Sequence, residues 1–182
     1  MLEILIPEQK DLFDSNTNEF LSVKETKLIL EHSLLSLKKW EGRWKIPFLS
    51  TKLNQEQMID YIRCMTVSKN VPDDVYRVIP MEELQKVADY ISDKKTATTF
   101  SYSKMQEQAA RRGEIVTAEI IYYWMITLNI PVEFQKWHLS QLLALIRVVS
   151  IKNSKDGGKR KLSAKERHDI NLANRAKYHT KG

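Results

Sequence analysis

Apolar residues change their spacing along this chain near residue 33. Before that point, the short runs LEILI and EFLSVKETKLILEH alternate or stay apolar over a few residues, a pattern typical of strands. The KET within the second run can turn a hairpin. We therefore expect residues 1–32 to form a small N-terminal β-hairpin that packs on the rest of the chain.

From Ser33 onward the spacing becomes helical. Leu37, Trp40 and Trp44 recur at steps of three and four residues, and Ser33 is a suitable N-cap. Two tryptophans on one helical stripe are usually core residues. The pattern predicts a helix that Pro47 ends.

Two more helices are indicated by their start signals. Asn54 followed by Gln57 resembles a capping box, and Pro80 precedes MEELQKVADYI, whose early acids favour a helix N-terminus. Across residues 92–114 the periodicity is weaker. There we expect an extended loop with a brief strand at ATTF.

The last helices of the body lie on either side of Pro131. We expect one at about residues 117–128 and another at about residues 132–151, joined as a helical hairpin or corner. The following KNSKDGGKR is typical of a flexible linker. Ser163 and Glu166 then form a capping box that predicts a further helix with few apolar residues.

These elements predict a mainly α fold: a helical bundle with a small N-terminal β-hairpin and a basic, flexible C-terminal helix. Three parts follow: a β-rich segment at 1–32, a helical body at 33–151, and a basic linker with its helix at 152–182. The 182 residues are 42% hydrophobic and 29% charged, which suits one globular domain with an appendage.

The net charge of +6 is unevenly distributed. Residues 152–182 hold ten Lys and Arg against three acids, a net charge of +7, so the first 151 residues carry −1. The high isoelectric point therefore describes one segment and predicts no nucleic-acid surface on the body. The single Cys64 excludes an internal disulfide and fits a reducing compartment.

Sequence motifs for catalysis, cofactor binding or metal binding are absent. The chain has no phosphate-binding loop, dinucleotide fingerprint or nucleophile elbow, and its four histidines lack zinc-ligand spacing. We therefore predict a non-enzymatic protein without a catalytic, cofactor-binding or metal-binding residue. A hydrolase built on Asp60, Glu119 and His138 is the least favoured alternative. His32 and His138 border apolar stretches and are expected to be core or rim residues.

The most apolar passage is EIIYYWMITLNIP at residues 119–131. Its uninterrupted part, 120–128, is nine residues long, whereas a membrane span needs about 20. Residues 122–125 are large and consecutive, so they cover all sides of a helix, which then lies centrally in a bundle or faces a second protein. We expect an interaction groove here. The candidate partner-binding residues are Tyr122, Tyr123, Trp124, Met125, Phe134, Trp137, Glu119 and Arg147.

Two of these candidates are charged, and two interpretations of them remain open. Glu119 and Arg147 lie beside or within apolar helical stripes. They form a structural ion pair with each other in the simpler interpretation. In the other they supply a polar spot inside the groove that grips a ligand.

Several stretches in order resemble one family. They are LEHSLLSLKKWEGRWKIPFLS, MIDYIRCM, TATTFS, VTAEIIYYWMITLNIPVEFQKWHLSQLLALIRVVSIKN and the basic ANRAKYHTKG. Together they resemble the tail assembly chaperones coded in the tail-assembly region of long-tailed bacteriophages, over residues 28–182. No catalytic motif anchors the resemblance.

This resemblance implies a helical, non-enzymatic protein in the cytoplasm of the infected cell. Its partners would be the tape measure protein, a very long helical chain with exposed apolar faces, and also the major tail subunit. The chaperone would be a homo-oligomer or would bind in many copies along the tape measure. The family is also known for ribosomal frameshifting that yields a longer form.

Two alternatives use the same sequence features. One is a permanent virion component, an adaptor, tail or baseplate piece that joins neighbouring subunits through the apolar surface. The other, less favoured, is a nucleic-acid-binding protein that uses residues 152–182, whose affinity would fall steeply with salt. That segment lacks interleaved aromatic residues except Tyr178.

Overall fold

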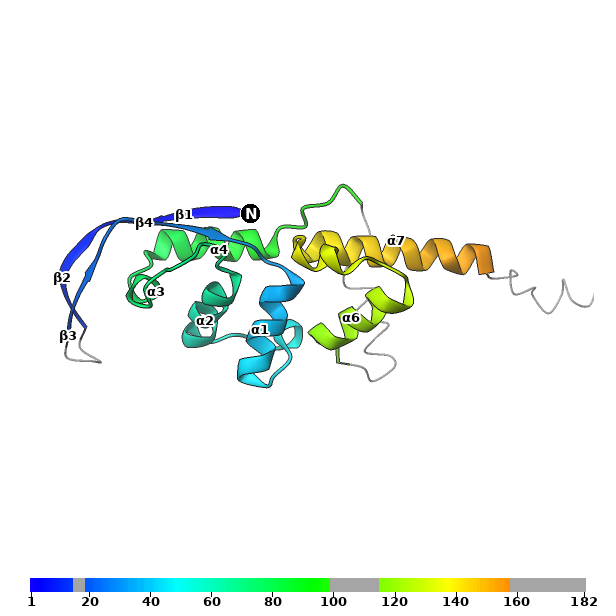
Figure 1. Cartoon of the computed structure of the whole chain (residues 1–182), viewed down its shortest axis with the longest axis horizontal. Coiled ribbons are helices and arrows are strands. Elements are labelled where there is room, and N and C mark those ends of the chain that lie inside the picture. The colour runs from blue at the N-terminus through cyan, green and yellow to red at the C-terminus, as the bar shows by residue number, and fades with distance from the viewer. Residues whose placement is uncertain (15–18, 99–114, 158–182) are drawn as a thin grey trace, which may run out of the picture. The chain divides into compact units, whose positions relative to one another are not determined.

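The computed structural model describes residues 1–14, 19–98 and 115–157 (Figure 1). The fold is mainly α with a small β part, as predicted. The chain divides into two units, Met1–Val148 and Val149–Gly182. The elements in order are β1 (Leu2–Ile6), β2 (Gln9–Asp14), β3 (Glu19–Val23), β4 (Thr26–Leu30), α1 (Leu34–Trp44), η1 (Phe48–Ser50), α2 (Gln55–Met65), α3 (Asp74–Arg77), α4 (Met81–Ser92), α6 (Ala118–Thr127), η2 (Val132–Lys136) and α7 (Leu139–Gly157).

The strands form antiparallel pairs, β1 with β4 and β2 with β3. Figure 1 shows β2 and β3 at the end of the strand pairs that lies away from the start of β1. The alternation in β1 and β4 buries one face, because Ile4, Ile6, Leu28 and Leu30 are all at most 2% exposed. This face closes one side of the core.

The predicted hairpin turn at KET is wrong. Lys24 and Glu25 separate β3 from β4, which continue in one direction, and the chain reverses between Asp14 and Glu19. The strand β2 was not predicted because its sequence, QKDLFD, has only two apolar residues and no strand-like alternation.

Helix α1 starts and packs as its sequence predicts. The Ser33 side chain accepts from the Ser36 N–H, and the Ser36 hydroxyl accepts from the Ser33 N–H, which completes a capping box. Trp40 is fully buried, and its Nε1 donates to the Gln57 carbonyl at 3.0 Å. The helix ends at Lys45 in the left-handed conformation (φ 58°), before Pro47 is reached.

The other two start signals are also confirmed. Asn54 caps α2 and exchanges hydrogen bonds with Gln57 in a capping box. Pro80 directly precedes α4, whose first turn carries Glu82 and Glu83. Local capping chemistry therefore fixes these boundaries.

Side chains from the strands and most of the helices meet in one core within residues 1–148. Its largest fully buried members are Trp40, Tyr61, Ile6, Leu28, Leu30, Leu34, Leu37, Ile62, Met65, Ile121, Met125 and Leu139.

The predicted helix at 132–151 is wrong at both ends. Residues Val132–Lys136 form the short 3₁₀ helix η2, and α7 starts only at Leu139. The interruption has a physical cause: His138 bridges to Ser33, and the Leu139 N–H donates to the His32 carbonyl at 2.8 Å. These contacts tie the chain to the start of α1 and prevent a continuous helix.

Helix α7 also extends to Gly157, through residues predicted as linker. No proline interrupts 152–157, and their polar residues are tolerated in a helix until the glycine pair. The helix predicted from Ser163 lies outside the described residues, as do 99–114 of the predicted loop. The helical bundle and the three-part division stay predictions.

Candidate functional site

Helix α6 divides into a buried and an exposed side. Ala118, Ile121 and Met125 are at most 2% exposed, at the spacing of one helical face. On the other side Tyr123 is 59% exposed and Ile126 is 74% exposed. We call these two residues the α6 face. It presents large apolar side chains to solvent, whereas Ala118, Ile121 and Met125 on the opposite side belong to the core.

Exposed apolar side chains continue in η2, which follows α6 in the chain. Val132 and Trp137 are 55% and 42% exposed. The rings of Phe134 and Trp137 lie 4.3 Å apart, centroid to centroid, and tilted by 41°. We call Phe134 and Trp137 the η2 ring pair. The two segments are joined by a hydrogen bond of 2.7 Å from the Tyr122 hydroxyl to Gln135 Oε1.

The carboxylate of Glu41 holds the start of α6. Thr117, the N-cap of α6, makes no side-chain cap bond. Instead Glu41 Oε2 accepts from the Ala118 N–H at 2.7 Å, and Oε1 accepts from the Phe48 N–H at 2.9 Å. Burial raises the pKa of Glu41, against the lowering effect of these two N–H donors, and the nearby Glu119 raises it further.

The other end of α6 is fixed by a tight reversal. The Ile130 N–H donates to the Met125 carbonyl at 2.8 Å, and Asn129 adopts the left-handed conformation with φ 53°. Asparagine tolerates this region better than most residues. On the flank, Lys38 Nζ lies 5.4 Å from the centre of the Tyr122 ring. Helix α6 is therefore anchored at both ends, and its exposed face is held in place.

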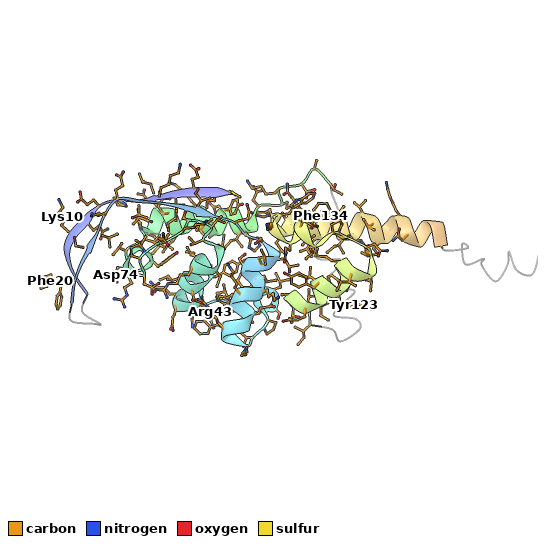
Figure 2. The ribbon with its side chains drawn as sticks, in the orientation of Figure 1. Lys10, Phe20, Arg43, Asp74, Tyr123 and Phe134 are labelled. Carbon is orange, nitrogen blue, oxygen red and sulfur yellow. The ribbon has the colours of Figure 1, made fainter. Side chains whose placement is uncertain are left out.

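The eight predicted partner-binding residues lie on α6, around η2 and on α7. Figure 2 shows Tyr123 on α6 and Phe134 close to the start of α7. Met125 is buried in the core, and Trp124 is half-buried. Among these residues the exposed apolar side chains belong to the α6 face and the η2 ring pair, and the groove itself stays a prediction. Partner binding by these residues stays a prediction.

The charged candidates lie on different helices. Glu119 is exposed in the first turn of α6, and Arg147 is half-buried on α7. The ion pair between them stays a prediction. The acidic side chain stands one helical turn before Tyr123, so it borders the α6 face.

A buried polar network beneath the start of α1 was not predicted. His32 Nδ1 and the Tyr61 hydroxyl share a hydrogen bond, and the His32 and His138 rings lie 5.2 Å apart in an edge-on arrangement. His138 Nε2 donates to the Tyr90 carbonyl at 3.1 Å, and its Nδ1 bonds the Ser140 hydroxyl at 2.8 Å. Both histidines are 5% exposed, so their prediction as core residues is confirmed.

This environment keeps both histidines neutral. Burial, with a smaller contribution from His138, lowers the pKa of His32 to about 3. Burial also lowers the pKa of His138, although its bond to the Tyr90 carbonyl and the charge of Glu31 oppose the shift. The network thus serves as neutral packing that links α1, α2, α4 and α7.

One open pocket lies between the end of α1 and α2, with a volume of about 530 Å³. Its lining combines opposite charges with apolar surface: Arg43, Trp44, Glu56, Ile59, Asp60 and Arg63. Both oxygens of Asp60 are engaged, one by Arg43 Nη1 at 2.6 Å and one by Trp44 Nε1 at 2.9 Å. The carboxylate of Asp60 therefore acts as a structural acceptor in this pocket.

The residues of the least favoured hydrolase hypothesis have separate environments. Asp60 bonds Arg43 and Trp44 on α1, Glu119 is exposed on α6, and His138 is buried. Burial raises the pKa of the Cys64 thiol to about 11, which keeps it protonated and inert at neutral pH. Among Asp60, Glu119, His138 and Cys64, the described contacts do not pair a nucleophile with a general base.

Metal and membrane chemistry find no support in the part of the chain that is described. Residues 1–14, 19–98 and 115–157 contain no group of three His, Cys, Asp or Glu side chains arranged to hold a metal ion. No helix within the same ranges combines the length and the hydrophobicity that crossing a membrane requires.

The chain was compared with known proteins. No protein-family model matches it, and neither a curated protein nor a solved structure matches it.

Proposed function

We propose that this protein is a phage tail assembly chaperone that binds the tape measure protein and keeps it soluble in the host cytoplasm until tail subunits assemble. Two findings support the proposal. One is the ordered resemblance of residues 28–182 to that family. The other, which carries the structural argument, is the exposure of Tyr123 and Ile126 on a helix that is anchored at both ends.

The chemistry of the α6 face suits a long amphipathic helix as partner. A helix in solution with an unpaired apolar side aggregates unless that side is covered. Covering Tyr123 and Ile126 removes on the order of 200 Å² of apolar surface from water, about 5 kcal/mol at roughly 25 cal/mol per Å². Much of this is offset by the cost of association, so one site is weak.

Weak sites fit the proposed task. A chaperone must cover its partner and later be displaced by tail subunits. If the copies are joined in a homo-oligomer, many weak contacts along one long chain add up to strong coverage, because each further contact becomes intramolecular, while any single contact is still easily displaced. Anchoring α6 through Glu41 and Asn129 lowers the ordering cost at each site.

The test is co-expression of the full chain with the tape measure protein of the same phage, followed by pull-down. We expect soluble complex with the wild type and loss of at least most of it with Tyr123→Ser combined with Ile126→Ser. Met81→Ser is the matched control, because Met81 is 77% exposed on α4, outside the α6 face. It should bind like the wild type.

Two results would overturn the proposal. One is a tape measure protein that gains no solubility and no bound partner from the wild type. The other is full binding by the double variant when circular dichroism shows it folded, which would remove the α6 face from the interface. Mass spectrometry of mature particles addresses the alternative, since a permanent virion component is found there and a chaperone is not.

A further inference from the structure

The β2–β3 pair carries an aromatic contact in solvent. Phe13 and Phe20 are directly opposite in the register, and their rings lie 5.3 Å apart, centroid to centroid, with a tilt of 56°. Phe13 is 53% exposed and Phe20 is 71% exposed. Figure 2 shows Phe20 at the outer end of the strand pair. Both aromatic side chains leave most of their surface free for a partner.

The adjacent register position has a second unusual feature. Asp14 is paired with Glu19, so two acids stand directly opposite each other on neighbouring strands. Like charges in this position destabilise a sheet. A cationic segment bound at this end of the strand pair would bring positive charge to a register position with two acids while it covers the aromatic rings.

The acids of the chain are concentrated around these strands. Residues 1–31 hold seven Asp and Glu and three Lys, a net charge of −4, whereas residues 152–182 have a net charge of +7. Part of the negative charge is already paired within the strands, as in the 2.6 Å contact of Lys27 with Glu3 and the 3.2 Å contact of Lys10 with Glu8.

We propose that the outer end of the β2–β3 pair, formed by Phe13, Phe20, Asp14 and Glu19, binds the basic segment 152–182 of a second copy of this chain. The charge complementarity of the two surfaces identifies the occupant. Each copy then offers one acidic acceptor and one basic donor. A reciprocal exchange of segments closes a pair of copies, whereas one-way contacts produce rows or rings. This association requires no tape measure protein and does not rest on the proposed function.

The experiment uses two charge-reversed forms of the full chain, each followed by sedimentation velocity over a wide concentration range. The strand form carries Asp14→Lys and Glu19→Lys. The segment form carries Lys159→Glu, Arg160→Glu and Lys161→Glu. We expect the wild type to associate with rising concentration, less so when salt increases from about 50 mM to about 500 mM, because screening shortens the reach of the charges.

The variants should behave in a complementary way. Each form alone should associate more weakly than the wild type, because the strand form brings residues 1–31 from −4 to 0 and the segment form brings residues 152–182 from +7 to +1. An equimolar mixture of the two should associate more strongly than either form alone, since the unaltered strands of the segment form (−4) then meet the unaltered segment of the strand form (+7). Phe20→Ser should weaken the wild-type association about tenfold or more, and Met81→Ser should leave it unchanged.

Three outcomes would refute the proposal. They are a wild type that is monomeric at every concentration, association in either form alone that is as strong as that of the wild type, and a mixture that associates no more than either form alone although both forms melt like the wild type. A contact between the strands and segment of the same copy would appear as the first of these. If the strand form fails to fold, the segment form and Phe20→Ser still decide the question.

Discussion

Replacement of Glu41 tests how the exposed face of α6 is held. In the folded chain this carboxylate accepts the Ala118 N–H and the Phe48 N–H, both in buried surroundings. Glu41→Ala removes both acceptors, and the Thr117 side chain makes no capping hydrogen bond at the start of α6 that could replace them. We expect a less stable fold whose α6 is loosened from α1.

The magnitude follows from the two donors. A buried N–H without an acceptor costs about 1–3 kcal/mol, so two of them cost about 2–6 kcal/mol. Part of this is offset, because the buried carboxylate is itself destabilised, as its raised pKa indicates. We therefore expect Glu41→Ala to lower the free energy of unfolding by about 2–4 kcal/mol and Glu41→Gln, which retains one acceptor, by about 1–3 kcal/mol.

Equilibrium unfolding in urea measures both values, and hydrogen exchange measures the local effect. The Ala118 and Phe48 amides should exchange faster in the glutamine variant. Glu8→Ala is the control, because Glu8 is an exposed partner of Lys10 and such a pair contributes less than about 1 kcal/mol. A Glu41→Ala protein as stable as the Glu8→Ala protein would refute the assignment of Glu41 as the anchor of α6.

Three further predictions follow from the described contacts. Burial lowers the pKa of His32 from 6.5 to about 3, so on acidification the unfolded chain binds the proton first. The free energy of unfolding should therefore fall between pH 6.5 and pH 3 by about 1.4 kcal/mol per pH unit. Urea titrations should show a smaller slope for His32→Gln, and an unchanged slope would contradict the network. Trp137→Ala should leave the thermal melt nearly unchanged, since its side chain is 42% exposed, whereas the half-buried Trp124→Ala should lower it; equal melts would contradict this placement. Deletion of residues 158–182 should preserve the cooperative melt of the body, because 149–182 form a separate unit; loss of cooperativity would show that the segment is structural.

The parts of the fold that were predictable depend on local chemistry. Ser33 and Asn54 cap their helices through bonds to residues three positions later, and Pro80 is preorganised for the start of α4. All the groups involved lie within one helical turn, so the sequence alone carries the signal. The burial of Trp40 was predictable for the same reason, since its stripe has the helical period.

The parts that were not predictable depend on contacts between distant residues. Glu41 and its donor, the Ala118 N–H, are 77 positions apart, and every residue except proline has such a backbone donor, so the sequence does not single this one out. The His32–His138 contact likewise joins the strand–helix junction to the start of α7. The same contacts shortened the predicted helix at 132–151, because they fix the backbone at residue 138 in an extended bridge.

The candidate site combines both kinds of information. The period of α6 shows which residues form a buried face, and the consecutive residues 122–125 show that the helix has more apolar side chains than that face needs. Only the structure separates Met125, which is in the core, from Tyr123, which is in solvent.

An apolar residue that is exposed on a loose helix is ordinary. Tyr123 and Ile126 are exposed on a helix whose first turn is held by a buried carboxylate and whose end is closed by Asn129. These two contacts hold α6 in place before any partner binds. A partner would therefore meet a surface that is already ordered. The anchor at Glu41 and the exposed α6 face are therefore best tested together.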